Sequence, residues 1–295
     1  MIIQDAVIAI TGGAQGLGKA MALGLARRGA NLALIDMNQE LLAQTQADCE
    51  ALGIQARTYL CDVSVESMVE STFKQIIEHF GQLDGLINNA GILRDKSFAK
   101  MELADFKLVM DVHLMGSVNC TKAVWDIMRE QNYGRIVMTT SSSGMYGNFG
   151  QSNYGAAKMA VLGLMNTLVI EGAKNNICVN ALAPTAGTRM TEDLMPEEIV
   201  KAFAPEAVTA GMLTLCDDEA PNRFILCAGA GGYSSASMFE TEGCFIPQTA
   251  QTPEAVREHW HELTALENQA ALASGAKQGE KFVMKAMAFM KSQQK

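Results

Sequence analysis

Tyr154 and Lys158 stand four residues apart in the run Tyr-Gly-Ala-Ala-Lys. On a helix this spacing places both side chains on one face, one turn apart. A cation held beside a phenol favours the phenolate, so we expect Lys158 to lower the pKa of Tyr154 from about 10 toward neutrality. The spacing is common, and an exposed pair on a helix face is the alternative interpretation.

Ser141 lies thirteen residues before Tyr154, in a serine-rich run that follows a predicted strand over residues 135–139. Tyr154 is near the start of a predicted helix over residues 152–174. In a parallel sheet, the loop after this strand and the start of this helix lie side by side at the carboxyl edge. Hydroxyls from both could then reach one substrate oxygen. An ordinary serine-rich loop is the alternative.

A glycine-rich turn of the pattern T-G-x-x-x-G-x-G begins at Thr11, between a predicted strand over residues 6–10 and a predicted helix over residues 17–28. Glycine lets the backbone approach a pyrophosphate closely, and the helix N-terminus offers N–H groups to the anion. A tight turn without a ligand is the alternative. The predicted dinucleotide contacts are Gly12, Gln15, Gly16, Leu17 and Gly18.

Two acidic positions follow the next predicted strands. Asp36 closes the strand over residues 31–35, where a carboxylate can accept hydrogen bonds from the adenosine ribose and would repel a 2′-phosphate. We therefore expect NAD rather than NADP, with an acid at a helix start as the alternative. Asp62 and Val63 follow the strand over residues 56–60 and are predicted to contact the adenine, although Asp62 could instead cap a helix.

The fourth predicted strand, residues 83–87, leads into Asn88-Asn89-Ala90-Gly91 at the same edge. Small residues there would let the cofactor ribose pack on the backbone, while an asparagine side chain ties neighbouring strands. We expect Asn89, Ala90 and Gly91 to line the cofactor site.

Together these residues predict hydride transfer at an alcohol or carbonyl carbon. Tyr154 takes the alcohol proton in oxidation and returns it in reduction. Ser141 orients the reacting oxygen, and Lys158 lowers the pKa of Tyr154 and can bind the nicotinamide ribose. NAD carries the hydride.

Strands and helices alternate along most of the chain, which predicts an α/β fold with a doubly wound parallel sheet. We expect a single NAD-binding and catalytic domain over residues 1–232. Residues 233–295 are expected to form a helical C-terminal extension that packs on the same domain or on a partner subunit. The remaining predicted strands are 177–182 and 224–227, and the remaining predicted helices are 39–52, 65–80, two within 102–130, 252–266 and 275–291.

The composition restricts the function. The chain has 295 residues and a formal net charge of −9, so nucleic acid is not an expected partner. Its seven cysteines lie apart without a C-x-x-C pair, so we expect buried thiols, no disulfides and no metal site. We see no signal peptide and no apolar run of membrane-spanning length, and therefore expect a cytoplasmic protein without a membrane span.

In order and spacing, these motifs resemble the short-chain dehydrogenase/reductase family over residues 6–232. The resemblance implies a Rossmann-type sheet, a small-molecule substrate and a homodimer or homotetramer. It also implies a proton-relay residue, normally an Asn three residues before a Gly. Gly116 places His113 there, which departs from the family. A relay through His113 and a buried, satisfied histidine at a helix kink are both open.

A narrower resemblance rests on four segments, residues 112–114, 133–135, 146–151 and 183–191, and it continues through residues 252–268. They are similar to the dehydrogenase part of the peroxisomal multifunctional enzyme type 2, a group that includes the type 4 17β-hydroxysteroid dehydrogenase. This implies a (3R)-hydroxyacyl-CoA dehydrogenase of fatty acid β-oxidation, without the other parts of the animal enzyme. Pro184 and Thr188 match the family's nicotinamide contact.

Other readings stay open. A hydroxysteroid dehydrogenase could act on a sterol or on a sterol side-chain CoA thioester, and a non-catalytic NAD-binding scaffold is the alternative of another class. Asp36 disfavours a 3-oxoacyl reductase that uses NADPH. Arg94, Lys96 and Arg189 could meet CoA phosphates or be solvated charges. An apolar lid or a packed helical hairpin is predicted from Met190, Met195, Phe203 and Met212.

Overall fold

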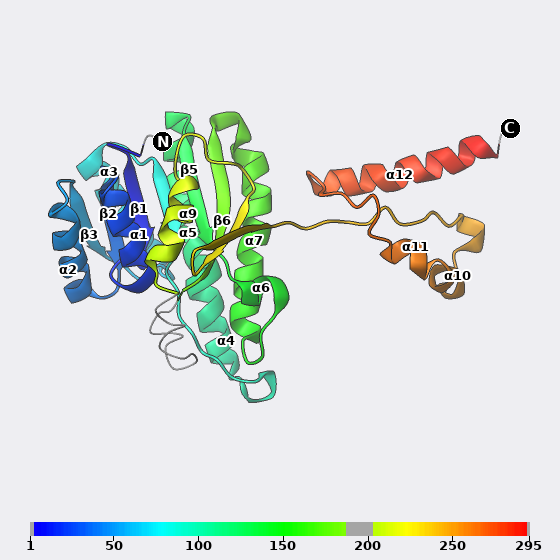
Figure 1. The fold of residues 1–295 in the computed structure, drawn as a ribbon, viewed down its shortest axis with the longest axis horizontal. Helices are drawn as coiled ribbons and strands as arrows, with labels where there is room; N and C mark the ends of the chain where they lie inside the picture. Colours follow the sequence, from blue (N-terminus) through cyan, green and yellow to red (C-terminus); the bar gives the residue numbers. More distant parts are fainter. Residues whose placement is uncertain (1–2, 187–202, 294–295) are drawn as a thin grey trace. The chain divides into compact units, whose positions relative to one another are not determined.

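A computed structural model describes residues 3–186 and 203–293. Its single eight-stranded sheet has the order β3-β2-β1-β4-β5-β6-β7-β8 (Figure 1). Neighbouring strands from β3 to β7 are parallel, as the alternation of elements predicted. The strands are β1 Val7–Thr11, β2 Asn31–Asp36, β3 Ala56–Leu60, β4 Gly85–Asn88, β5 Gly134–Thr139, β6 Ile177–Thr185, β7 Ile225–Gly229 and β8 Gly232–Ala236.

Helices cover both faces of the sheet, which makes it doubly wound. On β1, Ile8 and Ile10 pack in the layer that includes α1 and α9, whereas Val7 and Ala9 pack in the layer that includes α3, α5 and α7. This alternation follows from the two-residue period of a strand. The helices of this part are α1 Gly16–Ala26, α2 Gln39–Glu50, α3 Glu66–Phe80, α4 Leu103–Met110, α5 Gly116–Gln131, α6 Ser142–Tyr146, α7 Ser152–Gly172 and α9 Glu206–Thr214.

The strand order reverses at β1, which has β2 on one side and β4 on the other. In open α/β sheets ligands bind beyond the carboxyl ends of the strands at such a point. The exits of β1, β4 and β5, with the loops and helices that follow them, therefore form the part of the fold to search for a site.

The structure corrects two local expectations and confirms a third. The serine-rich run after β5 is not only a loop, because Ser142–Tyr146 forms α6. The helices predicted within residues 102–130 are α4 and α5, joined by a π-helical turn at Asp111–Met115. Residues 233–236, assigned to the extension, form β8, which pairs antiparallel with β7 and so belongs to the sheet.

The Tyr133–Arg135 segment is structural rather than catalytic, because it lies at the amino end of β5. The buried Arg135 donates to the carbonyls of Asp217 and Asp218 at 2.9 and 3.2 Å. Its guanidinium also lies 4.2 Å from the centroid of the Tyr133 ring. These bonds fasten the start of β5 to the segment before β7.

The chain divides into two compact units, residues 1–236 and 237–295. In the second unit the helix predicted over residues 252–266 is two short helices, and Lys281 and Lys285 form ion pairs of 2.5 Å with Glu240 and Glu242. The surface on which this unit packs stays a prediction. Its helices are α10 Pro253–Glu258, α11 Trp260–Thr264 and α12 Gly275–Ser292.

Candidate active site

The exits of β1 and β4 are bonded together. The hydroxyl of Thr11 accepts from the N–H groups of Asn89 and Ala90, each at 3.0 Å. The Asn89 side chain donates in return to the carbonyls of Thr11 and Gly12, at 3.1 and 3.2 Å. The expectation that an asparagine ties neighbouring strands is thus met by Asn89, and Gly91 continues from this junction.

The glycine loop is packed too tightly for side chains. Gly12 has a φ of +66°, and a Cβ at Gly18 would lie 2.0 Å from the Gly12 carbonyl oxygen. Helix α1 begins at Gly16, directly after Gln15, so its first N–H groups, including that of Leu17, lie at this loop. Close backbone approach beside a helix N-terminus is the geometry that a pyrophosphate requires.

Asp36 braces this loop. Its two carboxylate oxygens accept from the N–H groups of Ala14, at 3.2 Å, and Asn38, at 3.0 Å. A carboxylate has about four acceptor positions, so these bonds leave capacity for ribose hydroxyls. The helix cap of α2 is Asn38 rather than Asp36.

Asp62 and Val63 have structural partners. The Asp62 carboxylate accepts from the backbone and hydroxyl of Ser64, at 2.9 and 2.7 Å, in the turn that leads into α3. Val63 is buried, and a Cβ at Gly116 would lie 2.6 Å from its Cγ2 atom. These contacts fix the exit of β3 against α5, and an adenine contact at Asp62 or Val63 stays a prediction.

Ser141, Tyr154 and Lys158 come together at the exit of β5. The Ser141 hydroxyl caps α6 by accepting from the Ser143 N–H at 3.2 Å, and its hydrogen bond to Tyr154 lowers the pKa of that phenol. Lys158 is 3% exposed, and its Nζ lies 5.6 Å from the centroid of the Tyr154 ring. The same Nζ donates to the carbonyl of Thr139 at 2.7 Å.

The pKa values around Tyr154 correct the expectation from the sequence. Burial raises the pKa of Tyr154 above its usual value of 10, and this outweighs the opposing effect of Ser141. Burial also lowers the pKa of Lys158 to about 7, so its charge is only partly present near neutral pH. Lys158 therefore does not bring the pKa of Tyr154 toward neutrality in this arrangement.

Two glycines permit the close packing of α6 on α7. A Cβ at Gly144 would lie 2.9 Å from the Cβ of Lys158, and one at Gly155 would lie 3.0 Å from the Ser143 carbonyl. The Thr140 hydroxyl adds a bond of 2.7 Å to the Lys158 carbonyl. Small residues at these positions bring Ser141 within reach of Tyr154.

His113 lies in the π-helical turn and is 3% exposed. Its Nε2 is 3.0 Å from the N–H nitrogen and 2.8 Å from the carbonyl oxygen of Ile92, while Nδ1 has no partner among the described residues. Burial, aided by the Lys158 charge, lowers the pKa of His113 to about 3. The ring is therefore neutral, and it meets the Tyr154 ring edge to face at 5.2 Å.

Gly91 provides the space for His113, because a Cβ there would lie 2.3 Å from the imidazole Cε1. Sequence reasoning did not connect these two residues.

Sequence reasoning also missed Asn153, which is fully buried. Its side chain donates to the Arg94 carbonyl at 3.0 Å and accepts from the Tyr154 N–H at 2.7 Å. A polar residue directly before the tyrosine was the available signal for Asn153.

The remaining residues that the sequence predicted to contact the cofactor or substrate are only partly placed by the structure. Pro184 lies near the end of β6, whereas Thr188, Arg189, Met190 and Met195 are outside the described residues. Met212 is buried in the core beside α1 and cannot be a lid residue. Arg94 is bonded to the Leu93 carbonyl and lies 3.7 Å from Asp105.

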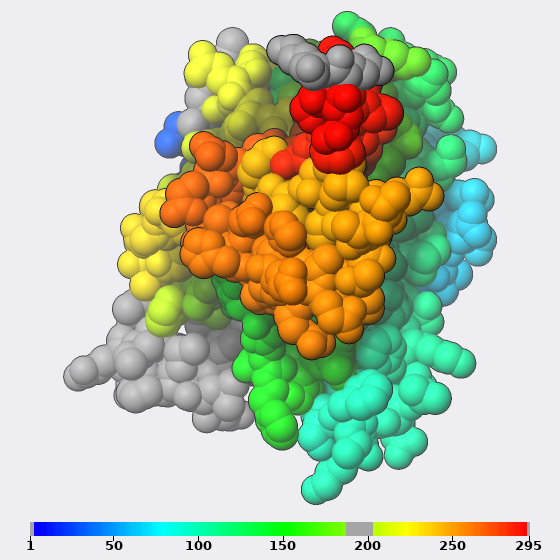
Figure 2. All heavy atoms as spheres, turned by 90° about the vertical axis from the view of Figure 1, so that its right-hand side faces the viewer, coloured from blue at the N-terminus to red at the C-terminus, as the bar shows by residue number. Residues whose placement is uncertain are grey.

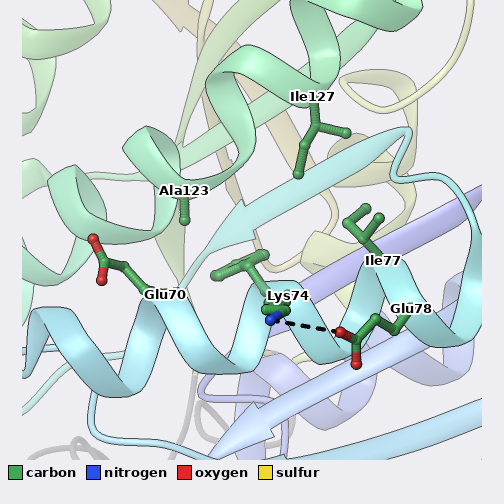
Figure 3. A pocket seen from close by; sticks show the side chains of 7 residues that line it. Glu70, Lys74, Ile77, Glu78, Ala123 and Ile127 are labelled. Carbon is green, nitrogen blue, oxygen red and sulfur yellow. Dashed lines mark ion pairs between the residues drawn. The ribbon is translucent and has the colours of Figure 1, made fainter.

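A surface hollow of about 510 Å³ lies between α3 and α5 (Figure 3). Its charged groups include Lys74 and Glu78, which pair at 3.9 Å. None of the hydroxyls or ring nitrogens described above line it, so the catalytic centre is assigned to the strand exits. Its lining residues are Glu70, Phe73, Lys74, Ile77, Glu78, Ala123 and Ile127.

Within residues 3–186 and 203–293 no group of three His, Cys, Asp or Glu could hold a metal ion.

Comparisons with known sequences agree with this arrangement. A family model for short chain dehydrogenase matches residues 6–199. Peroxisomal multifunctional enzyme type 2 of Mus musculus is 42% identical over 271 residues, 89% of this chain and 37% of that protein. A short-chain type dehydrogenase/reductase of Mycobacterium tuberculosis is 38% identical over 274 residues, 90% of this chain and 96% of that protein. A 3-oxoacyl-[acyl-carrier-protein] reductase of Synechocystis is 36% identical over 248 residues, 81% of this chain and 96% of that protein.

Solved structures are also similar. Full-length peroxisomal multifunctional enzyme type 2 from Drosophila melanogaster matches with a TM-score of 0.81 and 32% identity, covering 95% of this chain and 49% of that chain. NAD⁺-bound xylitol dehydrogenase matches with a TM-score of 0.72 and 29% identity, covering 78% of this chain and 100% of that chain. The chain thus spans about half of the fly protein and over a third of the mouse protein.

Burial of Lys158 gives the fold a pH dependence. The pKa of Lys158 is about 7 in the folded protein and 10.5 as an ordinary lysine. Between these values the unfolded chain binds more protons, so this residue's contribution to stability rises with pH. Below about pH 7 both states are protonated and the contribution is flat.

We expect the stability difference between wild type and Lys158→Met to grow in favour of wild type by up to about 1.4 kcal/mol per pH unit between about pH 7 and 9. Urea unfolding at several pH values measures it. Lys74→Met, at an exposed position of α3, is the matched control and should show no such slope. A difference that stays flat or falls as the pH rises would contradict the burial argument.

Proposed function

Because the chain belongs to the short-chain dehydrogenase family, we propose that it transfers a hydride from the 3-hydroxyl carbon of a (3R)-hydroxyacyl-CoA to NAD, giving the 3-oxoacyl-CoA. The observation that carries the oxidoreductase chemistry is the meeting of Ser141, Tyr154 and Lys158 at the exit of β5, two strands from the glycine loop at the exit of β1. The proposed substrate is supported by the similarity to the multifunctional enzymes of mouse and fly.

The residues present fit a dinucleotide. Gly12 and Gly18 leave no room for a Cβ, so the loop at the N-terminus of α1 is bare backbone, and Asp36 adds a carboxylate at the adjacent strand exit. NAD accepts the hydride when it is bound. The contacts proposed for it are Gly12, Gln15, Gly16, Leu17, Gly18, Asp36, Asp62, Val63, Asn89, Ala90, Gly91, Tyr154, Lys158, Pro184 and Thr188.

The chain's own residues handle the proton. Tyr154 takes the proton of the 3-hydroxyl as the hydride leaves the same carbon, and Ser141 donates a hydrogen bond to the reacting oxygen. Lys158, held on the Thr139 carbonyl, supplies positive charge when protonated. Because burial raises the pKa of Tyr154, the phenol is protonated near neutrality and oxidation should accelerate as the pH rises.

We assign His113 a positioning role in this scheme. A neutral ring nitrogen either donates or accepts, so Nε2 bonds one group of the Ile92 peptide at a time. Through that bond and its contact with Tyr154, His113 holds the segment after Gly91 against the catalytic tyrosine. The expected proton relay would need a partner at the buried Nδ1 and stays a prediction.

A homo-oligomer is part of the proposal, and α7 is its candidate contact. The segment Ser152–Asn175, which includes α7, is long and apolar enough to cross a membrane. Its most apolar 18-residue window has a mean hydropathy of 1.3, yet only 39% of that window is buried. The segment also carries Tyr154 and Lys158 and packs on β5 and β6, so we interpret it as a helix of the α/β fold rather than a membrane span. Its exposed side includes Met159 and Ile170 and is open at Gly163. Such a face is stabilised by burial against a second copy.

One alternative reaction has specific support. The Synechocystis relative is named a 3-oxoacyl-[acyl-carrier-protein] reductase, so reduction of an acyl thioester is the nearest alternative reaction. A hydroxysteroid substrate remains a second, and a scaffold without catalysis is the reading of another class. The cytoplasmic location stays a prediction, with a peroxisomal one as its rival because several relatives are named peroxisomal.

The substrate prediction is tested by NADH formation across (3R)- and (3S)-hydroxyacyl-CoAs of several lengths, with hydroxysteroids in parallel. We expect turnover of the (3R) thioesters to exceed that of the others. Tyr154→Phe should lower kcat by about 10²-fold or more, because the acid–base group is lost. Preference for a hydroxysteroid, or a Tyr154→Phe variant as active as wild type, would overturn the assignment.

His113→Asn is a control in the same assay. Asparagine offers a donor and an acceptor together and can bond both groups of the Ile92 peptide. We expect this variant to keep activity within about threefold, whereas His113→Phe, which retains a ring but no ring nitrogen, loses at least about tenfold. Equal losses in both variants would favour proton transfer through the imidazole.

Cofactor choice is tested at Asp36. We expect wild type to use NAD more efficiently than NADP, because the carboxylate repels a 2′-phosphate. Asp36→Asn should shift the ratio of kcat/KM values toward NADP by about tenfold or more. Asp36→Ala is the comparison, since it also removes the bond to the Ala14 N–H and should lower efficiency with both cofactors. Equal use of NAD and NADP by wild type would contradict the prediction.

The oligomer prediction is tested by light scattering after size-exclusion chromatography. We expect a dimer or tetramer for wild type and a smaller mass for Gly163→Glu, because a buried carboxylate is costly. Ala43→Glu, on the exposed side of α2, is the matched control and should leave the mass unchanged. A wild-type monomer refutes oligomerisation, and an unchanged mass in Gly163→Glu refutes the α7 contact.

A further inference from the structure

Three aromatic side chains project into solvent near the catalytic edge. Phe149 is 90% exposed, Tyr146 is 75% exposed and Phe98 is 74% exposed. Burying a phenylalanine is worth about 1.5–3 kcal/mol, so a fold gains nothing from displaying several of them at one edge. A local group of exposed aromatics indicates a binding surface.

The loops that carry these residues are bonded to each other. The Lys96 N–H donates to the Gly150 carbonyl at 2.9 Å, and the Gln151 side chain donates to Asp95 at 2.7 Å. Asn153 bonds the Arg94 carbonyl directly before the catalytic Tyr154. The two segments, blue-green near residue 100 and green near residue 148, lie at the lower end of the fold in Figures 1 and 2.

The exposure of Phe149 is imposed by the backbone. Gly147 and Gly150 have φ values of +79° and +83°, which favour glycine and let the chain turn tightly on both sides of Phe149. The Asn148 side chain closes this turn with a bond of 3.1 Å to Gln151. Phe149 is therefore held outward by an ordered turn.

Basic charge accompanies the aromatic residues. Residues 94–100 contain three basic side chains and one acidic side chain in a chain of net charge −9. Arg94 already faces Asp105. Lys96 and Lys100 are exposed, and neither forms an ion pair within the described residues.

We propose that Lys96, Phe98, Lys100, Tyr146 and Phe149 form a binding site for the nucleotide end of an acyl-CoA substrate, here called the aromatic–lysine rim. The adenine ring stacks on the aromatic side chains, and the phosphates bond the two ammonium groups. This deepens the proposed function and rests on it. The rim suits an anionic thioester better than a free sterol, which carries neither phosphate nor adenine.

The test compares two substrates with the same hydroxyacyl group, a CoA thioester and an N-acetylcysteamine thioester that lacks the nucleotide. In the double variant Lys96→Glu, Lys100→Glu we expect KM for the CoA thioester to rise about tenfold or more, the size of a lost charge-assisted hydrogen bond. Phe149→Ala should raise the same KM by a smaller factor. Neither variant should change kcat or the KM of the N-acetylcysteamine thioester.

Lys74→Glu, on α3, is the control for one charge reversal away from the rim and should leave both KM values unchanged. The wild-type KM for the CoA thioester should also rise with salt, because phosphate–ammonium pairs are screened. Equal KM changes for both thioesters, or no change for the CoA thioester, would overturn the rim.

Calorimetry with coenzyme A alone tests the rim without relying on the proposed reaction, because it measures binding and not turnover. Binding to wild type that is lost in the double variant supports the rim even where no thioester is oxidised. If thioesters are oxidised but coenzyme A binds both proteins equally, the rim fails and the proposed function stands. A lower oligomer mass for Phe149→Ala would also overturn the proposal, since the surface would then be a contact between copies.

Discussion

The close packing of the start of α7 on the exit of β5 is the constraint on which the site depends. Gly144 and Gly155 leave no room for side chains where α6 and α7 meet, and Thr140 bonds the Lys158 carbonyl. A Cβ at Gly144 would force α6 and α7 to shift, and a Cβ at Gly155 would press on the Ser143 carbonyl. The approach of the Ser141 and Tyr154 hydroxyls therefore depends on the close backbone contact between α6 and α7.

Burial is the dominant electrostatic effect in this site. It raises the pKa of Tyr154 and lowers the pKa values of Lys158 and His113, so all three groups favour their neutral forms. Holding them inside the protein costs stability, which is common where titratable groups serve a reaction. The Thr139 carbonyl and the Ile92 peptide offset part of that cost by bonding Lys158 and His113.

Asp36 and Asn89 each have a structural role in addition to the cofactor contact proposed for them. Asp36 stands where a ribose would be recognised, and it also braces the glycine loop through Ala14. Asn89 lies at the expected cofactor edge and also joins β1 to β4. A loss of activity after substitution of either residue would therefore have two physical sources, the proposed ligand contact and the shape of the loop.

The sequence by itself determined the doubly wound sheet and the place of the reactive groups, because hydrophobic periodicity and glycine spacing are local signals. It also identified Ser141, Tyr154, Lys158 and the glycine loop as one constellation. Tertiary structure decided what depends on contacts between distant segments: the antiparallel β8, the buried Asn153 and the fit of His113 against Gly91. It also reversed the expected pKa shift of Tyr154, because desolvation depends on everything packed around a group and not on its neighbours along a helix.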